Sequence, residues 1–346
     1  MRELNKYAFA NAKIRAMLSY LIAPALFSRL LETADIYEIK DELKKTAYGL
    51  LMENISQDEL DLADLERQFL KYDLHIYSKI FMVLHTKREK DFVALLKQRY
   101  ELEQLKCVLR IWHKKIPVVL EEYLLGEKIS FDIDFKKIIL CQNIEEIILL
   151  LDETPYKKPL LKAREKFKER NSLFYLEAAL DVDYYQRLFE CTDKFSSLDK
   201  NIARRILGIE IDIENINRLI RMRKYYSIGM GEILDWVIPG GNKIDKDKVR
   251  QFYTSDGLSK VVESVALGPY SRIKDMMDEN AYLIENFLYE ILLHEVKRIL
   301  AGFPFTIGTV LGYLVLKHRE SKNITSLFYA KSYGFKKGEV EQLLNI

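Results

Sequence analysis

The residues best suited to binding chemistry lie in one basic and aromatic stretch in the second half of the sequence. It runs from Arg218 to Tyr226 and has the sequence RLIRMRKYY. Its cations could pair with phosphate and its tyrosines could stack on bases, so nucleic acid is one possible ligand. The whole chain, however, carries 54 basic and 52 acidic residues and has no general attraction for a polyanion. We therefore expect a solvated helix face or a surface for an acidic protein partner, and no nucleic acid.

Residue types that catalyse reactions or bind metals are present, but without the spacing that such sites need. The sequence contains no GxxxxGK[ST] or GxGxxG phosphate loop and no HExxH or CxxC metal motif. Asp181 and Asp183 could form an acid pair, yet residues two apart point to different sides of a helix. We interpret them as capping residues of a helix that begins at Ala179. An enzyme would need a deep pocket with titratable groups of shifted pKa, and we predict no catalytic residue, metal, cofactor or small-molecule substrate.

Histidine and cysteine are scattered. The histidines are His75, His85, His113, His294 and His318, and the cysteines are Cys107, Cys141 and Cys191. An odd number of widely spaced cysteines in apolar surroundings predicts buried, reduced thiols in a cytosolic protein rather than disulfides.

The basic stretch lies at the end of a predicted helical hairpin. Ile209, Ile213, Ile216 and Ile220 follow one another at steps of four, three and four residues, which is the spacing of a buried helical stripe. The glycines of the segment 229–231 then allow a turn, and a second apolar segment follows it.

The hairpin pattern occurs three times in the sequence. Three amides occupy the same position in it, Gln104, Asn215 and Asn323. The alignment places Arg110 on Arg221 and Lys331 on Arg223, whereas the third copy has Tyr329 in place of the first two arginines. We expect the amides to form hydrogen bonds between neighbouring helices.

A tyrosine marks each copy upstream of its hairpin. These residues are Tyr48, Tyr156 and Tyr270, and the intervals are 156 − 48 = 108 and 270 − 156 = 114 residues. A recurring period of this kind predicts repeated structural units. The predicted repeats are residues 1–135, 136–242 and 243–346.

Composition points to an all-α protein. Glycine (14) and proline (7) are few for 346 residues, and the alternation typical of strands is rare. Asp35 is a plausible helix N-cap and Pro24 should interrupt or restart a helix. The only stretch that resembles the apolar region of a signal peptide, 17–27, is too short to cross a bilayer and contains Pro24, so any membrane association should be peripheral.

Several segments resemble the C subunits of the V-type and A-type ATPases (ATP synthases), a family related to the d subunits of vacuolar ATPases. They are Tyr7–Met17 (YAFANAKIRAM), Ala179–Tyr185 (ALDVDYY), Asp212–Arg221 (DIENINRLIR), Ile238–Gly241 (IPGG), Pro304–Gly308 (PFTIG) and Glu320–Ile324 (ESKNI). The resemblance covers nearly the whole chain in the right order.

The resemblance implies three similar helical bundles around a pseudo-threefold axis, with a funnel shape. It implies a non-catalytic rotor component that links the central shaft, subunits D and F, to the membrane ring of c or K subunits, at the cytoplasmic face of the cell membrane. Such a component would couple ATP hydrolysis or synthesis to proton or sodium transport. The alternative is a free-standing helical-repeat scaffold for protein–protein interaction, and closure of the repeats on themselves would distinguish the two.

Four cations are candidates for contacts with the shaft in a partner-binding socket. They are Arg110, Arg221, Arg223 and Lys331. An ordinary solvated charge is the alternative for each of them.

Overall fold

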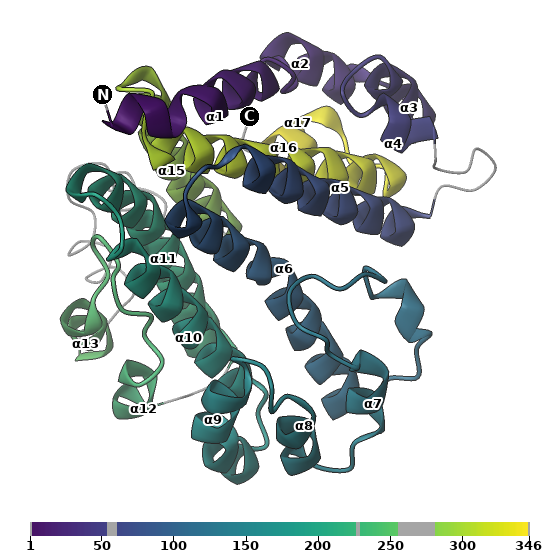
Figure 1. The fold of residues 1–346 in the computed structure, drawn as a ribbon. Helices are drawn as coiled ribbons and strands as arrows, with labels where there is room; N and C mark the ends of the chain where they lie inside the picture. The colour runs from purple at the N-terminus through teal and green to yellow at the C-terminus, as the bar shows by residue number, and fades with distance from the viewer. Residues whose placement is uncertain (1, 54–60, 226–228, 255–280, 345–346) are drawn as a thin grey trace.

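The computed structural model describes residues 2–53, 61–225, 229–254 and 281–344, and every regular element in these ranges is a helix (Figure 1). The predicted all-α class is therefore confirmed. The helices are α1 (Arg2–Leu18), α2 (Pro24–Glu32), α3 (Ile36–Lys44), α4 (Gly49–Glu53), α5 (Leu62–Val83), α6 (Lys87–Lys114), the short 3₁₀ helix η1 (Leu120–Glu122), α7 (Phe135–Leu140), α8 (Ile144–Leu150), α9 (Lys157–Arg170), α10 (Phe174–Thr192), α11 (Ser197–Tyr225), α12 (Met230–Leu234), α13 (Lys246–Thr254), α15 (Ala281–Ala301), α16 (Ile307–Ser332) and α17 (Lys337–Leu343).

Local sequence signals set several helix starts correctly and one incorrectly. Helix α2 begins at Pro24, where the missing N–H does no harm, and the Asp35 carboxylate accepts the first free N–H groups of α3. Helix α10 begins at Phe174, five residues before the predicted start at Ala179. The prediction was wrong because the buried helical face already includes Tyr175 and Leu176.

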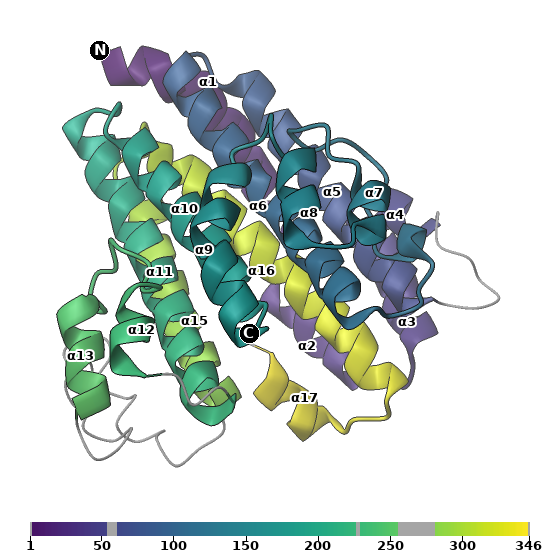
Figure 2. The same cartoon turned by 90° about the horizontal axis from the view of Figure 1, so that it is seen from below.

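Six helices of the described part have 19 or more residues, and they form three successive antiparallel pairs: α5–α6, α10–α11 and α15–α16. Each of the six packs against the next one, and the last, α16, packs against the first, α5. Several of them run in a common direction in Figure 2. The long helices therefore close into a ring of contacts. The funnel shape, the three separate bundles and their boundaries remain predictions.

The N-terminal segment completes the third helical pair. Helices α2 and α3 share a core with α16 and α17, in which Leu30, Leu43 and Phe328 are entirely buried. Segments almost 300 residues apart in the sequence thus pack side by side. By contrast, α7 lies close to α6 in the sequence, separated from it only by η1 and its flanking loops, and packs against it.

Candidate functional site

Buried tyrosines connect one predicted repeat to the long helix of another. The Tyr48 hydroxyl donates to Glu320 Oε1 at 2.7 Å, and the Tyr156 hydroxyl donates to Glu101 Oε1 at 2.9 Å. Burial, followed by the charge of the carboxylate, raises the pKa of both tyrosines, so that both stay protonated donors. Tyr270 lies outside the described residues.

The carboxylates occupy one equivalent position in the three predicted repeats. Glu101, Asp212 and Glu320 each precede the aligned amide by three residues. Each also accepts one or more backbone N–H groups from a segment just before a short helix, which is α7 for Glu101, α13 for Asp212 and α2 for Glu320. These donors are Ser130 and Phe131 to Glu101 (2.8 Å each), Ile244 to Asp212 (2.8 Å) and Ile22 to Glu320 (2.5 Å). The sequence contained this signal, an acid at a fixed distance before each amide, and our sequence reasoning missed it.

The expectation that the amides bond between neighbouring helices is wrong for Asn215. Asn215 Nδ2 donates to Ile238 O and its Oδ1 accepts the Ile238 N–H, both at 2.9 Å. Asn215 therefore holds the chain that follows α12, rather than a neighbouring long helix.

Arg110 and Tyr329 make equivalent contacts despite their different chemistry. Arg110 forms two hydrogen bonds to Glu177 of α10, at 2.6 and 3.1 Å, and the hydrogen bond to Glu177 is the main cause that raises the pKa of the guanidinium. The Tyr329 hydroxyl donates to Glu66 of α5 at 3.1 Å. The spacing 177 − 66 = 111 equals the spacing of the aligned amides, 215 − 104 = 111. The tyrosine thus replaces the arginine as a donor to the next long helix.

Lys331 and Trp112 form a second equivalent pair. Lys331 Nζ donates to the carbonyls of Leu31 (2.9 Å) and Thr33 (2.7 Å), at the C-terminal end of α2. Trp112 Nε1 donates to the Cys141 carbonyl at 2.7 Å, at the end of α7. Both satisfy carbonyls that a helix end leaves unpaired. The alignment missed Trp112 because an indole and an ammonium share only their N–H groups.

Two of the four candidate socket cations can therefore be placed by their contacts. Arg110 remains about half exposed, and Lys331 is partly buried against α2. Arg221 and Arg223 lie near the end of α11, but their side chains are outside the described part of the structure. Their grouping as a socket remains a prediction.

The interpretation of Asp181 and Asp183 as helix caps is wrong. Both lie inside α10. Asp181 pairs with Lys106 of α6 at 2.9 Å and with Arg218 of α11 at 3.0 Å, whereas Asp183 pairs with Arg187 at 2.7 Å. The first cation of the basic stretch is thus engaged inside the protein, which weakens the case for a nucleic-acid surface.

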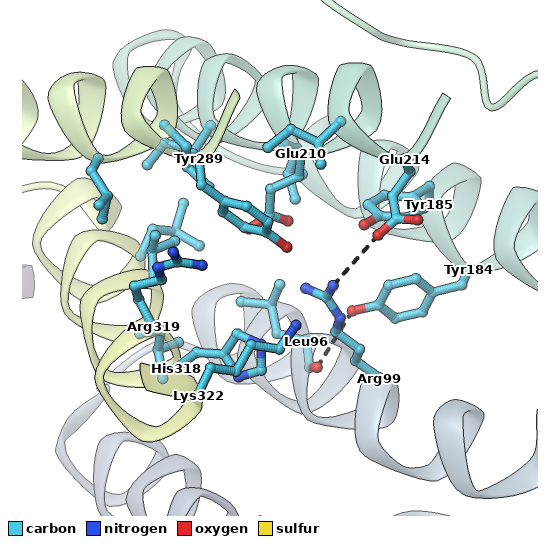
Figure 3. Close-up of a pocket in the computed structure, with 18 of the residues that line it drawn as sticks. Leu96, Arg99, Tyr184, Tyr185, Glu210, Glu214, Tyr289, His318, Arg319 and Lys322 are labelled. Carbon is cyan, nitrogen blue, oxygen red and sulfur yellow. Dashed lines mark hydrogen bonds and ion pairs between the residues drawn. The ribbon is translucent and has the colours of Figure 1, made fainter. Parts of the chain in front are cut away.

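A cavity lined by both apolar and charged side chains lies within the ring of long helices (Figure 3). Residues of all six helices line it, and its charged groups include Arg99, 3.7 Å from Glu214. Burial raises the pKa of Glu210 and lowers the pKa of His318. The cavity volume of about 60 Å³ corresponds to roughly two water molecules at about 30 Å³ each, which is far less than an organic substrate requires.

The thiols differ in burial. All three cysteines are free; Cys191 is buried, while Cys107 and Cys141 are only partly so. The expectation of buried thiols therefore holds for one of the three.

Comparison with known proteins decides the family. Residues 10–343 match the family described as ATP synthase (C/AC39) subunit. The chain belongs to this family. Membership of the C/AC39 family makes it a component of a rotary ATPase of the ATP synthase type, with other subunits of that complex as its partners.

Relatives within the C/AC39 family align over almost their whole length. The C subunit of the A-type ATP synthase of Methanocaldococcus jannaschii is 24% identical, and the alignment covers 99% of this chain and 87% of the relative. The proteins of the same name from Thermococcus gammatolerans (23% identical, 99% and 91% covered) and Methanosarcina mazei (25% identical, 95% and 90% covered) are similar to it as well. Among the described helices of this family member, none combines the length and apolar composition needed to cross a bilayer.

Proposed function

We propose that this chain is the non-catalytic rotor component that links the central shaft, subunits D and F, to the membrane ring of c or K subunits. In this role it passes torque between ATP hydrolysis or synthesis and the transport of protons or sodium ions. The observation that carries the proposal is the family match over residues 10–343. The protein would bind peripherally at the cytoplasmic face of the cell membrane and need no cofactor of its own.

Closure of the helical ring supports a mechanical role. A rotor part must resist bending and twisting, and an open stack of repeats has two free ends. Here α16 contacts α5, and the buried Tyr48–Glu320 hydrogen bond links the N-terminal segment to the last helical pair. The same closure argues against a free-standing open scaffold, whose concave groove would depend on an open stack.

The candidate socket supplies the proposed contact with the shaft. Arg110 keeps about half of its side chain exposed while Glu177 fixes the orientation of its guanidinium. A cation whose orientation is already fixed can bind an acidic side chain of a partner with little loss of conformational entropy. Arg221 and Arg223 are proposed to contact the shaft together with Arg110. Lys331, which lies beside the end of α2, is proposed to contribute to the same contact.

Reconstitution tests the proposed function. A complex assembled without this chain should keep ATP hydrolysis in its soluble head but lose ion transport driven by ATP. Adding the purified chain should restore transport. Transport of equal rate with and without the chain would refute the proposal.

Charge reversal tests the socket separately. Arg221→Glu together with Arg223→Glu should weaken binding to an isolated D–F shaft at least tenfold. Lys45→Glu, at the C-cap of α3 with a side chain that is 69% exposed, is the matched control and should bind as the wild type does. Unchanged affinity of the double variant would show that Arg221 and Arg223 do not contact the shaft. It would not contradict the proposed rotor function.

A further inference from the structure

Arg99 lies in the middle of the molecule with only one loosely placed partner. Its side chain extends from α6 into the central cavity, and the closest described carboxylate, that of Glu214 on α11, is 3.7 Å away (Figure 3). Among the described residues, no group accepts a hydrogen bond from the guanidinium, although it carries several N–H donors. Donors this deep in a protein are normally satisfied, so the guanidinium is suited to an acceptor that the chain itself does not supply.

The hydroxyl of Tyr185 is a second donor at the same cavity. Tyr185 lines the cavity from α10 and is only 4% exposed. Its hydroxyl forms no hydrogen bond within the described part of the chain, and burial raises the pKa of Tyr185, so that the hydroxyl keeps its proton. A guanidinium and a hydroxyl that both donate into one space are complementary to an anion.

The charges around the cavity also favour an anion. The second acid of α11 that lines it, Glu210, forms no hydrogen bond or ion pair with any described residue, and burial raises the pKa of its carboxyl. Glu210 is therefore a poor counter-ion for Arg99. The described lining contains two acids, Glu210 and Glu214, against three side chains that are always cationic near neutral pH, Arg99, Arg319 and Lys322.

The size of the cavity restricts the anion to a small one. A volume of about 60 Å³ holds a chloride-sized ion together with a water molecule, at about 30 Å³ for the water, and excludes nucleotides. A second cavity, of about 310 Å³, lies between α5, α15 and α16, and it shares Tyr289, His318, Arg319 and Lys322 with the first. Only side chains separate the two cavities, so rotation of these side chains admits a small ion along α16.

We propose that the central cavity binds one small inorganic anion, of the size of chloride, through the Arg99 guanidinium and the Tyr185 hydroxyl. Helices of all three long pairs line the cavity, so the anion stabilises the closed ring from its centre. This role goes beyond the proposed function and does not depend on it.

Thermal unfolding of the purified chain tests the proposal. The midpoint in sodium chloride is compared with the midpoint in sodium gluconate of equal ionic strength, because gluconate is too large for the cavity. We expect the wild type to unfold about 2 °C or more higher in chloride. Arg99→Gln should lose this difference. Arg29→Gln is the matched control and should keep the difference, because Arg29 also has an ion pair of 3.7 Å, to Glu42, but its side chain is 68% exposed.

Bromide locates the anion directly, because its anomalous scattering distinguishes it from water in a crystal. We expect a bromide peak within hydrogen-bond distance of Arg99 in wild-type crystals soaked in sodium bromide. This measurement and Arg99→Lys, which keeps the charge and should keep part of the chloride effect, decide the question if Arg99→Gln does not fold.

Three results would overturn the proposal. Bromide peaks confined to the outer surface would show that the cavity holds water only, and so would a chloride effect of equal size in the wild type and Arg99→Gln. A peak beside Arg99 without any chloride effect on the midpoint would indicate an adventitious ion only. None of these results concerns binding to the ring or the shaft, so the proposed function stands or falls by its own tests.

Discussion

The buried carboxylates of the predicted repeats accept hydrogen bonds from backbone N–H groups. At Glu320 a lysine also donates to the carboxylate. Lys317 Nζ lies 2.9 Å from Glu320 and 2.7 Å from the Tyr48 hydroxyl, and it also lies over the Tyr48 ring. Glu101, in contrast, receives two backbone N–H groups where Glu320 receives one. Lys317 therefore compensates the buried charge of Glu320, at the contact between the N-terminal segment and α16, which are far apart in the sequence.

Removal of this lysine should be costly. Lys317→Met leaves Glu320 buried without its cation, and we expect a loss of about 3–5 kcal/mol in the free energy of unfolding. Adding Glu320→Gln should recover much of the loss, because no charge then remains to be solvated. Urea unfolding of the single and double variants measures both effects. A single variant as stable as the wild type would show that the pair contributes nothing.

Glu210 in the central cavity should make stability depend on pH. Burial raises its pKa, and Arg99 only partly offsets this effect. For an acid with a raised folded-state pKa, stability is greatest below the unfolded pKa of 4.5 and falls as the pH rises through the folded value. Glu210→Gln should therefore stabilise the protein at pH 7.5 and change it little at pH 4. Unfolding free energies at the two pH values check the sign, and a variant that is destabilised at pH 7.5 would contradict it.

Helix packing near the turn between α15 and α16 depends on a glycine at the start of α16. A Cβ added to Gly308 would lie 2.5 Å from Ile299 Cγ2 of α15 and 3.0 Å from Ile202 Cγ2 of α11. Gly308→Ala should therefore destabilise the protein by about 1–3 kcal/mol through overpacking. Gly338→Ala in α17, where a Cβ meets nothing within 4 Å, should be neutral or stabilising by up to about 1 kcal/mol. Equal thermal midpoints for the two variants would show that this contact is not tight.

The sequence predicts these elements well where a local pattern encodes them. Three such patterns involve only neighbouring residues: the apolar stripe from Ile209 to Ile220, the proline at 24 and the N-cap at Asp35. The structure confirms the predicted helical features at these positions wherever it describes the side chains. The sequence does not show that Trp112 and Lys331 are equivalent. Their common feature is a hydrogen bond to a carbonyl at the end of a helix that is distant in the sequence. Asp181 was misread for the same reason: its partners lie on two other helices.

The whole molecule depends on a contact between the two ends of its sequence. Helices α3 and α16 share one core, in which Leu43 and Leu327 are entirely buried, and the Tyr48–Glu320 bond adjoins it. Segments that share a core open together, so their amides should exchange with solvent hydrogen with the same free energy of opening. Tyr48→Phe, which removes one buried hydrogen bond to a carboxylate, should lower both values by about 1.5–3 kcal/mol.

The equivalent substitution at Tyr156 provides the matched comparison. Tyr156→Phe removes the hydrogen bond to Glu101. It should therefore lower the protection of backbone amides against hydrogen exchange more in α6 and α8 than in α3. Hydrogen exchange read by mass spectrometry resolves these helices. If α3 exchanged far faster than α16 in the wild type, the N-terminal segment would be a loose appendage and the ring would not transmit torque across this contact. Matched protection in α3 and α16 is what the proposed rotor role requires, because force applied at the hairpin turns could then reach the far ends of all three helical pairs.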